Sequence, residues 1–265
     1  MQENKKKYSI IKSFLKSYWV LSDNVKAFFI QGSFFAVFML LISYLLGQKY
    51  MCFFNKGVAQ NMYCPNASLL FIVYFLLKLF AISVAVNVWY NSVFKKAEIS
   101  LAYFKSNVFK FLKSFVCILL FVVLNAMPMV SSLILFNRVP NPVWQKELMF
   151  FIIVSTGFWV PFILMRFYGL FAAFLAGENW KQFKKIWEKT SGFTMKIVIS
   201  CAFVFMVDLV ALISVFGTFS RPSNLPAELY NMSAEVSLAF AAYFIVITFL
   251  NFIEFQKNTF LDDNK

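Results

Sequence analysis

The stretch from residue 68 to residue 90, SLLFIVYFLLKLFAISVAVNVWY, decides the fold of this chain. It runs for 23 residues with Lys78 as its only charged side chain. A helix needs about 20 predominantly apolar residues to cross the hydrocarbon core of a bilayer. A strand of a membrane barrel would instead alternate apolar and polar residues, which this run does not do. The stretch therefore predicts a transmembrane helix.

Similar runs recur along the chain, and the composition agrees with them. The 265 residues are 61% hydrophobic and 14% charged, whereas a soluble domain is typically about 45–50% apolar and about 25% charged. Pro, Asn and Ser residues separate the runs and favour turns there. We predict an all-α bundle of six transmembrane helices, forming one integral membrane domain over residues 1–265. The predicted spans are 27–46, 68–90, 114–136, 148–176, 197–219 and 235–254.

The lysines and arginines predict the orientation of this bundle. The N-terminal segment, the connections 91–113 and 177–196 and the C-terminal tail hold 18 of the 25 basic residues, and the other three connections hold 5. Because basic residues stay on the cytoplasmic side, both termini are expected there. The net charge of +13 then indicates contact with anionic lipid headgroups rather than with nucleic acid.

The basic connection 178–196 also carries aromatic residues at helical spacing. Trp180, Phe183 and Trp187 fall on one arc of a helix, and its lysines fall on the opposite arc. A helix of this kind lies in the membrane interface, with its Trp rings at the headgroup level. The predicted interface anchors of the chain are Trp19, Tyr103, Trp180, Trp187, Lys181, Lys184, Lys185 and Lys189.

Two more segments are predicted to be interfacial helices. Residues 8–20 place Lys12 and Lys16 on one side of a helix and six apolar or aromatic residues on the other, namely Ile10, Ile11, Phe14, Leu15, Tyr18 and Trp19. The basic connection 95–112 is less cleanly sided, and we expect a short interfacial helix there.

The aromatic anchors recur at a constant interval. Trp19, Tyr103 and Trp187 are separated by 84 and 84 residues. The same offset aligns three small residues inside the first, third and fifth spans, namely Ser33, Cys117 and Cys201. The pattern predicts three copies of one unit: interfacial helix, span, outer loop, span. The alternative is coincidence in a chain with 37 phenylalanines.

The segment Ile186–Gly192, IWEKTSG, carries a resemblance to a known family. Preceded by Arg166-Phe167-Tyr168 and a Gly177-Glu178 turn, it resembles a Ser-Trp-x-x-Thr-x-Gly pattern of six-span bacterial proteins. That group comprises the YciC-like proteins and the membrane domain of glycerophosphoryl diester phosphodiesterases; Ile186 stands where the group has serine. The resemblance implies a bacterial inner-membrane location and a six-span architecture. It implies no catalysis, because the phosphodiesterase activity of the group belongs to a separate soluble domain.

Three polar side chains lie near the middle of predicted spans. Lys78 lies 10 residues into the second span, and Asp208 and Asn125 lie 11 residues into the fifth and third. At about 1.5 Å per residue each is about 15 Å deep, near the midplane of a core of about 30 Å. Charges at that depth face the bundle interior and pair. We therefore predict an ion pair between Lys78 and Asp208, with spans two and five adjacent; the pair either fixes helix register or relays a proton or ion.

The four cysteines and the lack of histidine bear on metal and redox chemistry. Cys52 and Cys64 bracket the first outer loop, where a disulfide is favoured over two interfacial thiols. The other two cysteines are expected to be buried. There is no CxxC spacing and no histidine, so we predict neither a zinc site nor another cofactor.

No convergent set of catalytic groups is visible in the sequence. We therefore expect a non-enzymatic inner-membrane protein that contacts anionic lipid. It would act in envelope maintenance, as an accessory to a membrane complex or as a homo-oligomer. The alternative is a transporter of small solutes or lipids that uses the intramembrane charges.

Overall fold

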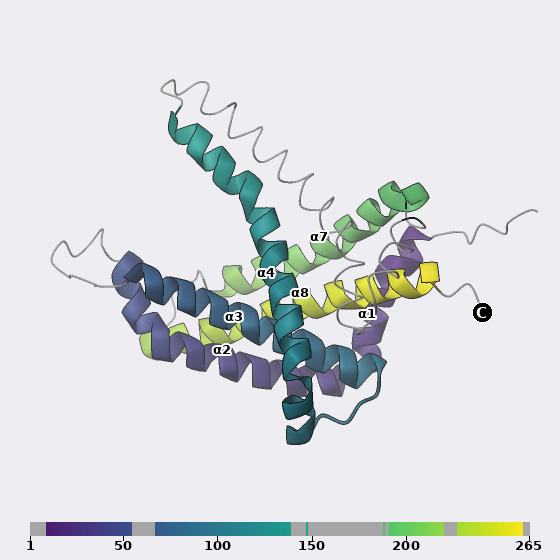
Figure 1. The fold of residues 1–265 in the computed structure, drawn as a ribbon, viewed down its shortest axis with the longest axis horizontal. Coiled ribbons are helices and arrows are strands. Elements are labelled where there is room, and N and C mark those ends of the chain that lie inside the picture. Colours follow the sequence, from purple (N-terminus) through teal and green to yellow (C-terminus); the bar gives the residue numbers. More distant parts are fainter. Residues whose placement is uncertain are drawn as a thin grey trace, which may run out of the picture.

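The computed structural model describes residues 9–54, 67–138, 147, 188, 191–219 and 227–261, and every element in this part of the chain is helical (Figure 1). The predicted all-α fold is therefore confirmed for these residues. The elements are α1 (Ile10–Asp23), α2 (Val25–Phe54), α3 (Ala67–Trp89), the π-helical turn η2 (Tyr90–Phe94), α4 (Leu101–Arg138), the 3-10 turn η3 (Ser191–Phe193), α7 (Thr194–Phe219) and α8 (Ala227–Leu261).

Four helical segments are long and apolar enough to cross a membrane: Val25–Leu46, Ile72–Phe94, Met195–Val215 and Met232–Thr259. They match the first, second, fifth and sixth predicted spans, which supports a multi-pass membrane protein. The third predicted span lies within α4, which continues through Pro128. The fourth, 148–176, lies outside the described residues.

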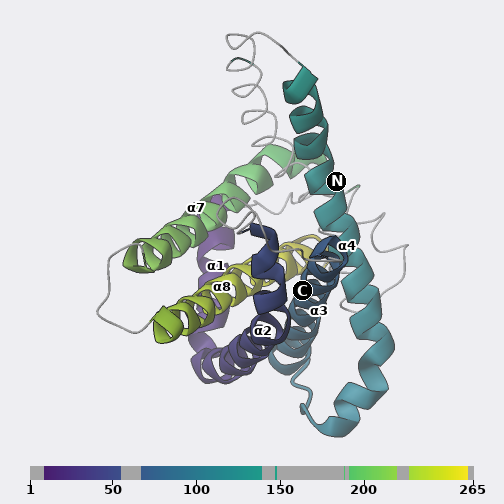
Figure 2. The same cartoon turned by 90° about the vertical axis from the view of Figure 1, so that its left-hand side faces the viewer.

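Helix α8 is the centre of the described bundle. It packs against α1, α2, α3 and α7, which surround it in Figure 2. Its residues Ala239, Tyr243, Ile247 and Leu250 recur every three or four positions and are buried. They form one apolar cluster with Trp89 of α3 and with side chains of α2.

The outward faces of these helices are apolar as well. Phe34 of α2 and Met206 and Val210 of α7 are large, exposed hydrophobic side chains. Exposed apolar side chains in such number are unusual in a soluble monomer, whereas lipid tails are as apolar as the side chains themselves. The outer surface is thus suited to a bilayer.

The structure of α4 contradicts the prediction of a short interfacial helix in the connection 95–112. The connection 95–112 is not a separate short helix, because residues from Leu101 onward continue into the third predicted span as one helix of 38 residues. At about 1.5 Å per residue this is about 57 Å, much longer than a hydrocarbon core of about 30 Å. Its buried positions Asn107, Phe111, Ser114 and Cys117 form a stripe, and α4 packs against α3.

The 84-residue interval does not give its small residues a common environment. Ser33 is exposed and donates to the Phe29 carbonyl oxygen at 2.8 Å. Cys117 and Cys201 are both buried thiols, as expected for that pair. The three positions therefore face different surroundings.

Candidate functional site

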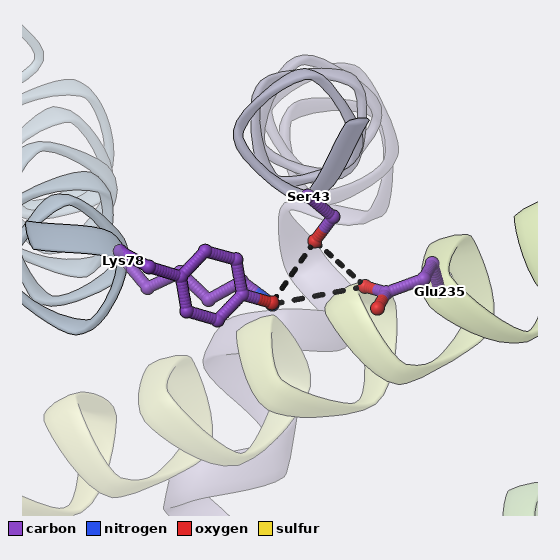
Figure 3. A network of polar contacts seen from close by, with 4 residues as sticks. Ser43, Lys78 and Glu235 are labelled. Atoms are coloured by element: carbon purple, nitrogen blue, oxygen red, sulfur yellow. Dashed lines mark hydrogen bonds and ion pairs between the residues drawn. The ribbon is translucent and has the colours of Figure 1, made fainter. Parts of the chain in front are cut away.

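Four side chains from three helices form a polar network near one end of α8 (Figure 3). Lys78 Nζ of α3 lies 3.7 Å from Glu235 Oε2 of α8, and these two side chains are 26% and 39% exposed. Ser43 Oγ of α2 donates to the same Glu235 oxygen at 3.1 Å and lies 3.2 Å from Tyr74 Oη. The Lys78 ammonium also stands 4.4 Å from the centroid of the Tyr74 ring.

The predicted ion pair between Lys78 and Asp208 is therefore wrong. Helix α3 packs against α2, α4 and α8, whereas α7 packs against α1 and α8. Because α8 contacts both helices, it supplies each charge with its own polar partner. The residue that sequence analysis misses is Glu235, because it is the first residue of the sixth predicted span and an acid there is typical of a span boundary. Its position inside the membrane-length segment Met232–Thr259 is the signal that could have identified it.

Asp208 belongs to a second network, at the junction of α1, α7 and α8. Its Oδ2 accepts from Thr248 Oγ1 at 2.8 Å, and its Oδ1 lies 3.3 Å from Tyr18 Oη. The Tyr18 hydroxyl also lies 3.2 Å from the Val204 carbonyl oxygen. Burial and the neighbouring Asp208 carboxyl raise the pKa of Tyr18, so its hydroxyl remains protonated. The sequence predicts Tyr18 on an interfacial helix but does not predict this contact.

A third network joins α1, α3 and α8 through Asn251. The Trp89 indole Nε1 donates to Asn251 Oδ1 at 2.9 Å, and Asn251 Nδ2 donates to the Ser17 carbonyl oxygen at 3.0 Å. All three residues are buried. One amide thus bridges a transmembrane helix and the amphipathic helix.

The same end of the bundle contains a buried ion pair. Lys257 Nζ lies 3.6 Å from Glu254 Oε1, one turn earlier on α8. It also lies 3.4 Å from the hydroxyl of Tyr90, the first residue of η2. On the other side of α3, Asn87 Nδ2 donates to Ser114 Oγ of α4 at 2.7 Å. These contacts tie the end of α3 to both neighbours.

Some apolar side chains of α1 pack against the bundle, and others are exposed on its outer side. Ser13 and Ser17 are fully buried, and Phe14 and Tyr18 are half-buried. On its outer side lie the exposed residues Ile11, Leu15 and Trp19, flanked by exposed Lys12 and Lys16.

The remaining predicted site residues are placed as follows. Tyr103 is half-buried at the start of α4, and its hydroxyl lies 3.5 Å from the Asn87 carbonyl oxygen. Asn125 and Cys52 lie in α4 and α2, and their side chains are outside the described set. The other predicted residues lie outside the described residues altogether, namely Trp180, Trp187, Lys181, Lys184, Lys185, Lys189 and Cys64.

Within the described ranges, no three His, Cys, Asp or Glu side chains come together as a metal site. The polar groups instead form small networks of carboxyl, amino, amide and hydroxyl groups. Such networks can orient helices and can hold protons. No family model, curated protein or solved structure matches this chain.

Proposed function

We propose that this chain is a non-enzymatic integral membrane protein that contacts anionic lipid through α1 and the other basic cytoplasmic segments. In this proposal it serves the cell envelope or a membrane complex as an accessory protein. Four membrane-length helices support the integral membrane location. The observation that carries the lipid contact is the division of α1 into an inner and an outer face.

The inner face of α1 is occupied by protein, whereas its outer face is left open. Ile11 is 69% exposed and Trp19 is 53% exposed. Lys12 and Lys16 flank these apolar side chains and are exposed as well. A helix that presents apolar and Trp side chains beside lysines is suited to the headgroup region of a membrane.

The same proposal includes six spans with both termini in the cytoplasm. Helix α4 supplies the third span, and residues 148–176 supply the fourth. The Ile186–Gly192 segment supports assignment to the YciC-like group and hence to a bacterial inner membrane. The 84-residue interval supports three related helix pairs. The observation against this repeat is that Ser33 is exposed, whereas Cys117 and Cys201 at the equivalent positions are buried.

The lipid contact is tested by removing charge from the outer face of α1. Lys12 and Lys16 are replaced together by Gln, and the anionic phospholipid retained by the purified protein is measured. Each lysine near an anionic surface contributes about 1 kcal/mol, so the double variant should bind anionic lipid about 2 kcal/mol more weakly. The matched control replaces Lys49 and Lys56, which lie in a predicted outer connection. Equal retention by the two double variants would contradict the proposal.

A transporter is the second candidate, and the Lys78–Glu235 pair favours it. Both side chains are partly exposed although they lie within membrane-length segments, where ionisable groups commonly mark ion or substrate pathways. The test measures proton uptake into proteoliposomes under an imposed membrane potential. A transporter predicts uptake above that of protein-free vesicles, and its loss when Lys78→Met is combined with Glu235→Leu. Uptake equal to that of empty vesicles counts against proton-coupled transport.

A further inference from the structure

Asp208 is a buried acid whose two partners are neutral hydroxyl groups. It is 2% exposed and lies within the membrane-length segment Met195–Val215 of α7. Thr248 of α8 and Tyr18 of α1 supply the hydroxyl groups. A carboxylate held this way costs much more free energy than a neutral carboxylic acid, because its charge is removed from water without a counter-charge.

Among the described residues, the helices packed around Asp208 present no cation to it. From α1 the titratable group that faces it is Tyr18, and from its own helix it is the thiol of Cys201. The acids of α8, Glu235 and Glu254, each pair with a lysine in another network. Over the described ranges, the polar partners of Asp208 are therefore the two hydroxyl groups.

The hydroxyl hydrogens at this site are fewer than the acceptors they contact. Tyr18 Oη lies 3.2 Å from the Val204 carbonyl oxygen and 3.3 Å from Asp208 Oδ1, but it has a single hydrogen to donate. Thr248 Oγ1 also has a single hydrogen, which it can donate to Asp208 Oδ2 at 2.8 Å or to the Phe244 and Ile245 carbonyl oxygens of its own helix, both at 3.0 Å. A hydrogen on Asp208 Oδ1 relieves the competition at Tyr18: Asp208 then donates to Tyr18, and Tyr18 donates to Val204.

We propose that Asp208 binds a proton within the membrane and that the protonated acid fastens α1 to α7 and α8. In this step the Asp208 carboxylate accepts one proton from a hydronium ion of the solvent: an O–H bond forms on Asp208, an O–H bond of the hydronium ion breaks, and water is left behind. When the proton leaves, Asp208 and Val204 compete for the single Tyr18 hydrogen, and an anion remains in a site closed to water. Both effects weaken the attachment of α1.

This proton site goes beyond the proposed lipid contact and does not depend on it. The site lies on the inner face of α1, whereas the lipid contact concerns Ile11, Trp19 and the lysines on its outer face. Failure of one proposal therefore leaves the other standing.

The first test detects the proton directly. Infrared spectra of the full chain in lipid nanodiscs at about pH 6 should contain the carbonyl band of a protonated carboxyl group, and Asp208→Asn should remove that band. Asp23→Asn is the matched control, because Asp23 is an exposed acid at the end of α1. If wild type and Asp208→Asn have the same carboxyl band, Asp208 is ionised and the proposal is wrong.

The second test measures the attachment of α1 by hydrogen exchange. Between about pH 6 and about pH 9, after correction for intrinsic rates, exchange of the α1 amides in wild type should become about fivefold faster, the factor expected for one lost hydrogen bond. In Asp208→Asn the amide NH2 replaces the donating acid hydroxyl, so α1 should exchange slowly at both values. An α1 that shows the same pH dependence in both proteins overturns the link between the proton and α1.

A cation is the competing occupant of this oxygen-rich site. Both measurements are therefore repeated with sodium replaced by choline. A carboxyl band that is unchanged by sodium supports the proton. A band that sodium abolishes shows a metal cation in place of the proton and refutes the assignment.

Discussion

At Gly32 the absence of a side chain brings α2 against α8. A Cβ atom at this position would lie 2.8 Å from Phe240 Cε1 and 3.2 Å from Tyr243 Cδ1. Contacts this short require the rings to move, and both rings belong to the packed interface between the two helices. The helix pair at the centre of the bundle therefore depends on one small residue.

We expect Gly32→Ala to destabilise the protein by about 1–3 kcal/mol, the usual range for an overpacked interface. The matched control is Gly217→Ala in α7, where an added Cβ would meet nothing within 4 Å. Because alanine favours helix over glycine by about 1 kcal/mol, the control should be neutral or stabilising. Thermal unfolding in detergent measures both changes. A Gly32→Ala protein as stable as the control would contradict the close contact.

The Lys78–Glu235 pair makes a prediction about charge. Lys78→Met should destabilise by roughly 1–2 kcal/mol, between the values for exposed and buried pairs, because Glu235 then lacks its cation. Adding Glu235→Leu should restore most of the loss, since the unpaired charge is then gone. Adding Asp208→Leu instead should not restore it. If Asp208→Leu restored the stability of Lys78→Met, the ion pair between Lys78 and Asp208 predicted from the sequence would be correct after all.

At the scale of elements, α1 shows what the sequence could and could not reveal. Its aromatic and lysine spacing correctly predicts an amphipathic helix near residues 8–20, observed at Ile10–Asp23. The same spacing does not predict that Ser13 and Ser17 form the inner face, because serine counts as polar in a pattern of apolar residues. In membrane proteins small residues let helices approach closely, so that a polar side chain of one helix can reach a backbone group of its neighbour. The Asn251 contact to the Ser17 carbonyl oxygen is one such contact.

Asn251→Leu should loosen α1 and the end of α3 together. It removes two hydrogen bonds of about 1 kcal/mol each, and it leaves the Trp89 indole N–H buried without its acceptor. We expect faster hydrogen exchange in α1 and a stability loss of about 2 kcal/mol. Asn258→Leu, an exposed position on the same helix, is the control. If only the global stability falls and α1 keeps its protection, Asn251 does not hold α1.

For the whole molecule, hydropathy predicts where the helices lie in the sequence better than it predicts which helices pack against each other. Each apolar run reflects the cost of placing backbone and side chains in hydrocarbon, and that cost is readable residue by residue. Which helices touch depends on contacts between residues far apart in the sequence. The sequence predicts Lys78 and Asp208 as intramembrane charges but not their partners on α8, because Glu235 stands at the boundary of the sixth predicted span and Thr248 is one of several uncharged polar residues in the spans.

The positions of lysine and arginine predict on which side of the membrane each connection lies. The connection that contains Glu147 distinguishes a six-span topology from a four-span topology. With six spans, reporters fused after Glu147 and Ala227 are outside the cytoplasm, and reporters after Lys105 and Lys189 are inside. If α4 and residues 148–176 did not cross, both termini and Ala227 would keep the same sides, since removing two spans preserves orientation. Only Glu147 would then move to the cytoplasm. The length of α4 favours crossing, because about 57 Å allows an interfacial first part and a full span beyond it. Alkaline phosphatase and fluorescent-protein fusions at Glu147 therefore decide between six spans and four, and phosphatase activity there is the expected result.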